Sequence, residues 1–271
     1  MTLRTRNRIT ISIFLLSSIL LFIFCILFTI TYSKGIIAPE VTNFAYKNGF
    51  SLLEYNPICV ILSIFILVLF VATTTIIIYR SFVKTQAPEI NFLLLFSISC
   101  IADSFRIMIP LLNLSNTYSE LYIFCGNATL FSMLLAPISI FFTVIINEAE
   151  FKQNIEKFLL ILIVLAAMIG NLIPLNTAVT LPNYAVSYSY KNAITIYSVI
   201  IYSAALIALF LINKSKLYSQ KTTIGLLLII LGRMSLFSSY NALLLGISVI
   251  LLFTGPFLYL KELHNQYLWN D

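Results

Sequence analysis

Eight long apolar runs divide the chain, and their length limits the fold more than any other feature of the sequence. Each run is near the roughly 17–25 residues that a helix needs to cross a bilayer. Lipid offers the backbone no hydrogen-bond partners, so a single segment at that depth has to be helical. We therefore expect an all-α, polytopic helical membrane protein with eight spans, at residues 9–32, 58–79, 90–112, 121–146, 158–175, 194–212, 224–240 and 243–260.

The last two runs share one apolar stretch, which is broken only by residues 238–241. At about 1.5 Å per residue, a single helix over that stretch would be too long for one crossing. We therefore favour a tight helical hairpin there. The alternative is a chain of seven spans that ends in one long, tilted or broken helix.

Basic residues set the expected orientation, because cytoplasmic loops of membrane proteins are enriched in lysine and arginine. With the N-terminus in the cytoplasm, eleven of the sixteen basic residues lie inside and three lie outside. We thus expect both termini in the cytoplasm, and a cell membrane (plasma or bacterial inner) as the location. Residues 1–260 would form one transmembrane bundle, followed by a short amphipathic tail at 261–271.

The composition excludes several classes of protein. Hydrophobic residues make up 60% of the chain and charged residues 10%, against about 45–50% and about 25% in soluble domains. A soluble enzyme, a disordered chain and a nucleic-acid binder are therefore ruled out, and the net charge of +6 reflects topology. We expect the lipid bilayer as a partner, together with a membrane or cytoplasmic protein, and no nucleic acid.

Residues for metal, cofactor or enzyme chemistry are scarce. His264 is the one histidine, and the four cysteines form no C-x-x-C pair, so we expect no metal and no cofactor. The sequence has no G-x-S-x-G, H-E-x-x-H or Walker motif. No pair of carboxylates lies within the spans for acid–base chemistry. We expect no enzymatic activity, and we keep a lipid-modifying enzyme built on one aspartate and two arginines as a third alternative.

Three charged side chains lie deep in the spans, namely Asp103, Arg106 and Arg233. A charge near the bilayer centre costs about 2.5–3.5 kcal/mol on insertion scales, so such residues are candidates for function. Asp103 and Arg106 are three residues apart and share one helix face. Their mutual pairing would make insertion tolerable without excluding a functional role.

Both arginines are expected some 10–12 Å below the outer end of their spans, at about 1.5 Å per residue. Asn127, Asn171 and Tyr202 fall at a similar depth on three other spans. If the groups converge, two guanidinium groups face one carboxylate, and the surplus charge calls for an anionic ligand, a lipid headgroup or an acidic partner helix. The alternative is that the arginines snorkel to the outer headgroups.

Two further segments carry aromatic residues near the membrane boundary. Tyr184, Tyr188 and Tyr190 lie in the loop 176–193, where an aromatic belt is the simple interpretation and a lid over a ligand the sharper one. In the tail, apolar residues recur at helical spacing, which predicts either an interfacial helix end or a docking helix for another chain. The candidate docking residues are Leu263, His264, Tyr267 and Leu268.

Two functions remain in view. The first is a membrane sensor or complex-assembly subunit with a polar site in the outer half. In span number and loop size the chain resembles the multi-span sensor regions of bacterial signalling proteins, without a shared motif. The second is a transporter for a small anionic or amphipathic solute, which would need polar access from both sides of the membrane.

Overall fold

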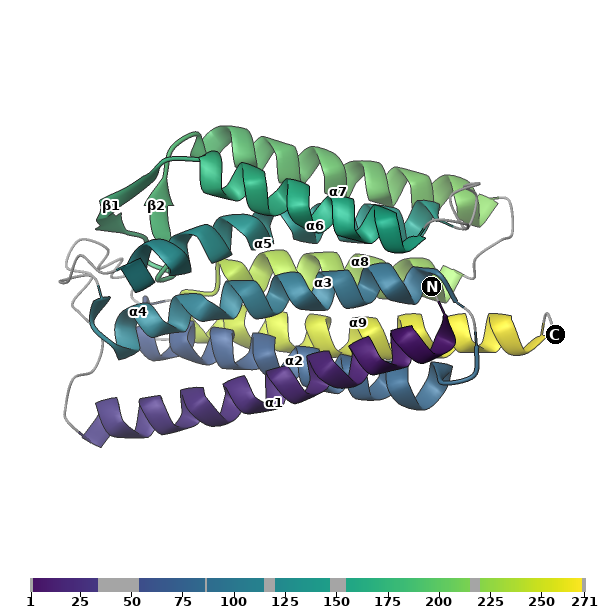
Figure 1. The fold of residues 1–271 in the computed structure, drawn as a ribbon, viewed down its shortest axis with the longest axis horizontal. Coiled ribbons are helices and arrows are strands. Elements are labelled where there is room, and N and C mark those ends of the chain that lie inside the picture. The colour runs from purple at the N-terminus through teal and green to yellow at the C-terminus, as the bar shows by residue number, and fades with distance from the viewer. Residues whose placement is uncertain are drawn as a thin grey trace.

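The computed structural model describes residues 2–33, 54–85, 87–114, 120–146, 155–214 and 220–269. Within these ranges eight helices are long and apolar enough to cross a membrane. They run side by side along the longest axis of the molecule (Figure 1). The expected all-α polytopic fold is therefore confirmed.

The spanning helices follow the predicted runs closely. The third crossing is composite: α3 (Glu89–Ser104) passes through a 3₁₀ turn, η2 (Phe105–Ile107), into α4 (Met108–Leu111). The others are α1 (Leu3–Ser33), α2 (Pro57–Phe82), α5 (Glu120–Ile145), α6 (Ile155–Leu172), α7 (Lys191–Lys214), α8 (Gln220–Phe237) and α9 (Ala242–Trp269).

The end of the chain forms two helices, which decides between seven and eight spans. α8 stops at Phe237, and the Asn241 side chain accepts a hydrogen bond from the Leu244 backbone N–H at 2.9 Å. That bond caps the first turn of α9, as asparagine commonly does. Both termini consequently lie at the same end of the bundle, which we call the tail end (Figure 1).

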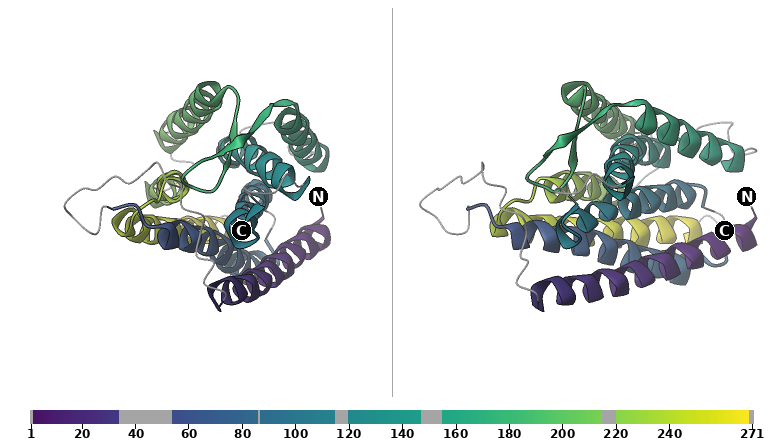
Figure 2. Two further views of the ribbon diagram at one scale, coloured as in Figure 1. Left: turned by 90° about the vertical axis from the view of Figure 1, so that its left-hand side faces the viewer. Right: turned by 60° about the vertical axis from the view of Figure 1, so that its left-hand side comes forward.

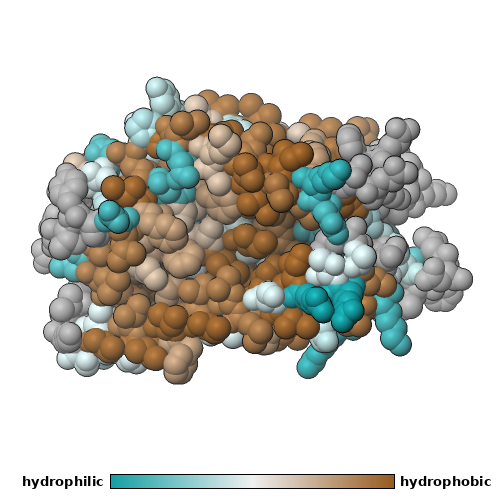
Figure 3. Space-filling model, viewed as in Figure 1, coloured by the Kyte–Doolittle hydropathy of each residue, from teal (hydrophilic) through white to brown (hydrophobic). Residues whose placement is uncertain are grey.

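The helices are buried to different degrees. α3 lies at the centre, between α1 and α2 on one side and α5 on the other. In the third crossing, 78% of the residues in the most apolar 18-residue stretch are buried. α1, α6 and α7 lie at the rim, and in each of them only 22% of the residues in the corresponding stretch are buried. Apolar side chains cover the middle of the face in Figure 3, and polar ones gather mostly toward its ends. This surface suits a lipid environment.

A small β-hairpin occupies the segment between α6 and α7, where the sequence predicted a loop. Strands β1 (Leu175–Thr180) and β2 (Val186–Tyr188) pair antiparallel. The hairpin lies at the end of the bundle opposite the tail end, and we call this the hairpin end. From α6 and α7 it reaches toward the middle of the bundle (Figure 2, left). Tyr184 is fully buried and Tyr188 nearly so, while Tyr190 is exposed. An aromatic belt is therefore wrong for the first two tyrosines, which pack inside the protein.

α8 and α9 approach each other backbone to backbone. A Cβ added at Gly232 would lie 2.8 Å from the Leu252 backbone nitrogen, and one added at Gly225 would lie 2.7 Å from that of Tyr259. By contrast, a Cβ added at Gly246 meets nothing within 4 Å. Close helix contact in membranes depends on such small residues, so the two helices form a tightly joined pair.

Replacing Gly232 should therefore loosen the pair. We expect Gly232→Ala to lower the free energy of unfolding by about 1–3 kcal/mol, because the new methyl group would meet backbone that has to shift. Gly246→Ala is the matched control and should cost nothing, since its methyl group has open space and alanine favours helix. Thermal unfolding of both variants in one detergent measures the difference. Equal midpoints would contradict the close approach.

Candidate functional site

The three charged residues that the sequence placed inside the spans converge at the hairpin end. α3 carries Asp103, η2 carries Arg106 and α8 carries Arg233. Asp103 and Arg106 are 0% exposed and Arg233 is 5% exposed. The snorkelling alternative therefore fails, because neither guanidinium group reaches the surface.

One carboxylate oxygen serves both arginines. Asp103 Oδ2 lies 2.9 Å from Arg233 Nη2 and 3.7 Å from Arg106 Nη2. The closer pair joins two helices, whereas the sequence favoured pairing between the neighbours on one helix. With two guanidinium groups and one carboxylate, the cluster holds one surplus positive charge.

Two polar groups from other elements and one aromatic ring of α8 surround the arginines. Arg233 Nη2 donates to Ser132 Oγ at 3.1 Å, and Arg106 Nη1 donates to the Asn183 carbonyl oxygen at 3.4 Å. Asn183 belongs to the turn between β1 and β2, so the hairpin covers Arg106. The Phe237 ring faces both cations, with its centroid 4.8 Å from Arg106 Cζ and 5.7 Å from Arg233 Cζ. Such contacts favour buried cations.

A proline helps to shape the third crossing around Arg106. Pro110 has no backbone N–H and therefore cannot bond to the carbonyl group four residues earlier, which belongs to Arg106. The crossing tightens into the 3₁₀ turn at Phe105–Ile107 just before the proline. In addition, Cys125 Sγ of α5 contacts the Phe105 carbonyl oxygen at 3.3 Å. Arg106 thus projects from an irregular turn, a feature that often accompanies functional positions.

The cluster lies nearer to the end of the bundle than the sequence suggested. α8 ends at Phe237, only four residues beyond Arg233, which is about 6 Å along the helix axis. The sequence predicts roughly 10–12 Å because its apolar run continues to residue 240. The helix stops sooner because residues 238–241 make the turn into α9.

The remaining predicted site residues fare differently. Tyr202 is buried on α7 and lines a cavity together with Arg233. Asn127 is half-buried on α5, where its backbone faces Gly170 of α6. Asn171 is exposed on α6, so the structure does not bring it into the charged cluster. The sequence predicts a similar depth for these residues, but it does not predict the direction in which each side chain points.

Three contributors to the site were missed from the sequence. Phe237 follows Arg233 by four residues, a spacing that places both on one helix face and could have signalled the contact. Ser132 lies inside an apolar run, where a lone serine usually bonds to its own helix. Asn183 comes from the hairpin turn, whose position over the bundle no local pattern predicts.

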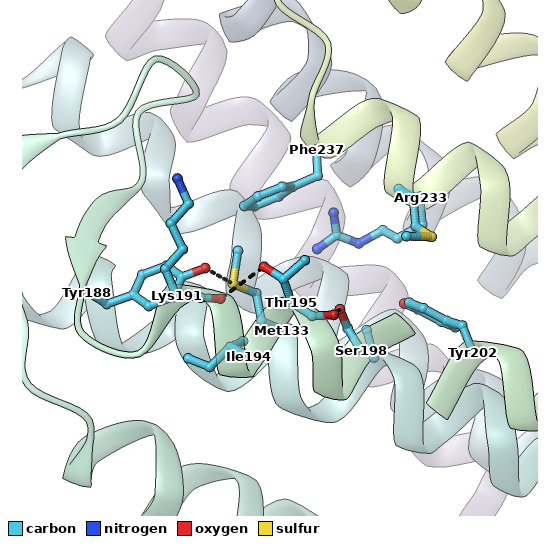
Figure 4. A pocket seen from close by; sticks show the side chains of 11 residues that line it. Met133, Tyr188, Lys191, Ile194, Thr195, Ser198, Tyr202, Arg233 and Phe237 are labelled. Atoms are coloured by element: carbon cyan, nitrogen blue, oxygen red, sulfur yellow. Dashed lines mark hydrogen bonds between the residues drawn. The ribbon is translucent and has the colours of Figure 1, made fainter. Parts of the chain in front are cut away.

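A cavity of about 200 Å³ opens beside Arg233. It lies between α5, α7, α8 and β2, and its walls are mostly apolar. Figure 4 shows the Arg233 guanidinium group pointing into this space, with Phe237 above it and Lys191 on the far side. Tyr188 lies at one wall and contacts Met133 Sδ through its hydroxyl at 3.3 Å.

The tyrosine at the cavity wall adds no counter-charge. Burial raises the pKa of Tyr188 to about 12, so its phenol is neutral near pH 7. The surplus positive charge of the cluster is therefore not balanced from the hairpin side of the cavity.

In the described residues no group of three histidine, cysteine, aspartate or glutamate side chains is placed to hold a metal ion.

The predicted docking residues of the tail pack against the chain itself. α9 continues without a break past residue 260 to Trp269. Leu263 is fully buried, the His264 ring meets the Phe82 ring edge-on at 5.4 Å, and the Tyr267 hydroxyl donates to Glu89 Oε2 at 2.9 Å. The Leu268 side chain lies outside the described part of the structure. The tail thus joins α9 to the ends of α2 and α3.

No family model, curated protein or solved structure matches this chain. The geometry of the site and the chemistry of its residues therefore carry the functional conclusion.

Removing the shared carboxylate should destabilise the protein strongly. We expect Asp103→Asn to lower the free energy of unfolding by about 3–5 kcal/mol, because it leaves buried guanidinium groups without an anionic partner. Thermal unfolding in detergent measures the loss, and Glu120→Gln, at an exposed position in the first turn of α5, is the control.

A variant with no charge in the cluster distinguishes the effect of charge on stability from the effect of packing. The triple variant Asp103→Asn, Arg106→Gln, Arg233→Gln should recover most of the stability that Asp103→Asn loses, since no buried charge then lacks a partner. An Asp103→Asn protein as stable as the unmodified chain would contradict the shared-carboxylate arrangement.

Proposed function

We propose that the protein is a membrane sensor subunit that binds an anionic ligand in the cavity beside Arg233. One observation carries the proposal: Arg233, a residue that is only 5% exposed, forms part of the wall of a cavity and belongs to a cluster with a surplus positive charge. An uncompensated buried cation is costly. An anion in the cavity offsets that cost, and the energy so gained favours binding.

The two arginines have different surroundings, which directs the ligand to Arg233. Arg106 donates to a peptide oxygen of the hairpin and lies closer to the Phe237 ring. Both arginines have an Nε without a hydrogen-bond partner among the described residues, but only Arg233 is among the residues that line this cavity. Arginine suits carboxylate and phosphate groups because its planar fork can donate two parallel hydrogen bonds.

A route from the site to the tail supports a sensor. Gly232 precedes Arg233 on α8 and lies against the α9 backbone. α9 in turn carries Tyr267 to Glu89 at the tail end. A shift of α8 on ligand binding would therefore move α9 and alter the contacts of the tail, where a cytoplasmic partner would read the change.

Anion binding tests the proposal through Arg233→Met. The probes are acetate, inorganic phosphate, dodecanoate and dodecyl phosphate, added to purified protein in a neutral detergent. At least one should raise the unfolding midpoint, by an amount equivalent to about 2.7 kcal/mol at one hundred times its Kd. The gain should vanish in Arg233→Met, whose cluster keeps the one-to-one pair of Asp103 and Arg106.

The control for this experiment is Arg80→Met, which removes an exposed arginine near the end of α2. It should respond to the probes as the unmodified chain does. Stabilisation that survives Arg233→Met would sink the binding proposal. Saturable flux of a bound probe through liposomes would instead favour the transporter alternative.

Hydrogen exchange at the tail tests the sensor part. With the stabilising anion bound, amide exchange in residues 261–267 should change, because α9 links the site to the tail. Arg233→Met should show no change under the same conditions. Binding without any response in this segment would leave an anion-binding protein and exclude transmission through α9.

A further inference from the structure

The cavity beside Arg233 opens through the side of the helical bundle. Thr195 on α7 and Met234 on α8 both line it, and both are exposed. The two residues lie within membrane-spanning helices. In a bilayer this opening faces lipid.

Approach along the bundle axis is restricted by the hairpin. The Asn183 carbonyl oxygen accepts from Arg106, and the Asn183 side chain donates to the Phe237 carbonyl oxygen at 3.4 Å. The Tyr55 hydroxyl, next to the start of α2, donates to the Pro182 carbonyl oxygen at 3.0 Å. These contacts hold the hairpin turn over the cluster, which leaves the gap between α7 and α8 as the more accessible route.

The charged groups of the cavity lie near one end of the membrane-spanning helices. Lys191 is the first residue of α7 and is exposed at the boundary of the span. Arg233 lies one helical turn inside the end of α8. Figure 4 shows the two side chains on opposite sides of the cavity, with the Phe237 ring above the space between them. An anionic headgroup would therefore have a cation on each side.

The remaining walls of the cavity are mostly apolar and favour an apolar ligand. Met133, Ala136, Ile194 and Phe237 surround the space next to the arginine. A small hydrated anion would leave these walls in contact with water, whereas an alkyl chain would cover them at a gain of about 25 cal/mol per Å² of apolar surface buried. One end of the cavity thus favours an anion and the rest favours hydrocarbon.

We propose that the ligand is an amphipathic anion taken from the bilayer, with its carboxylate or phosphate head between Arg233 and Lys191 and its alkyl chain leaving between α7 and α8. This assignment rests on the proposed anion site. It adds the chemical class of the ligand and its lateral route of entry.

The test uses the full chain in nanodiscs of phosphatidylcholine, with dodecanoate, dodecyl phosphate, dodecanol, acetate and inorganic phosphate as probes. We expect saturable binding of dodecanoate or dodecyl phosphate, with the better of the two identifying the head. Dodecanol lacks the charge, and acetate and phosphate lack the chain, so all three should bind at least about tenfold more weakly, equivalent to about 1.4 kcal/mol.

Single-residue variants test where the anionic head of the ligand binds and where the ligand enters the cavity. Lys191→Gln should weaken binding of the charged amphiphile several-fold, while Lys84→Gln, which removes an exposed lysine at the tail end, should leave it unchanged. Thr195→Trp should obstruct the opening and abolish binding of the amphiphile. Ile196→Trp, at an exposed neighbouring position of α7, is the matched control and should have no effect.

The outcomes separate this inference from the proposed function. If acetate or inorganic phosphate binds as tightly as dodecanoate and depends on Arg233, the anion site stands and the amphipathic ligand is overturned. Unchanged amphiphile binding in Thr195→Trp would overturn lateral entry. If no probe binds, or if binding persists in Arg233→Met, the proposed function fails together with this inference.

Discussion

The arrangement of the bundle depends on one carboxylate that two guanidinium groups share. Asp103 is fully buried and meets Arg106 from its own crossing and Arg233 from α8. Buried charges are tolerated when they are paired, so the rotation of α3 and α8 about their axes is restricted to orientations that keep these contacts. Apolar packing in lipid offers little such direction, since side chains gain as much from lipid tails as from each other. The charged cluster therefore contributes orientation where hydrophobicity does not.

The same chemistry leads to two different roles for the arginines because their surroundings differ. Arg106 emerges from the 3₁₀ turn before Pro110 and is covered by a peptide oxygen of the hairpin. Arg233 has a serine hydroxyl on one side and a cavity on the other. Arg106 thus stabilises the closure of the hairpin over the bundle. The surplus charge is left on the side where a ligand can approach.

Hydropathy predicted the spans well because crossing a bilayer depends on the length and apolarity of a segment, with little dependence on neighbours. It also indicated Asp103, Arg106 and Arg233, since buried charges are conspicuous in apolar runs. The direction of a side chain around its helix axis was harder to predict: Asn171 was expected in the polar layer, but it is exposed near the end of α6. The hairpin turn that carries Asn183 was missed because β2 has only three residues, too few for a visible alternation. Contacts such as that from Ser132 arise from tertiary packing and leave no local signal.

In the proposed sensor, α8 carries the candidate site and also packs directly against α9. Successive helical residues are about 100° apart around the axis, so Gly232 and Arg233 face different neighbours. Gly232 contacts the α9 backbone with no side chain between them, and such a contact transmits displacement because close-packed backbone cannot absorb it. Arg233 joins the cavity to Asp103. A ligand that draws the guanidinium group toward the cavity would weaken its hold on the shared carboxylate and shift α8 against α3. α9 would then move with α8, and the Tyr267–Glu89 contact at the tail end is where that movement meets the end of α3.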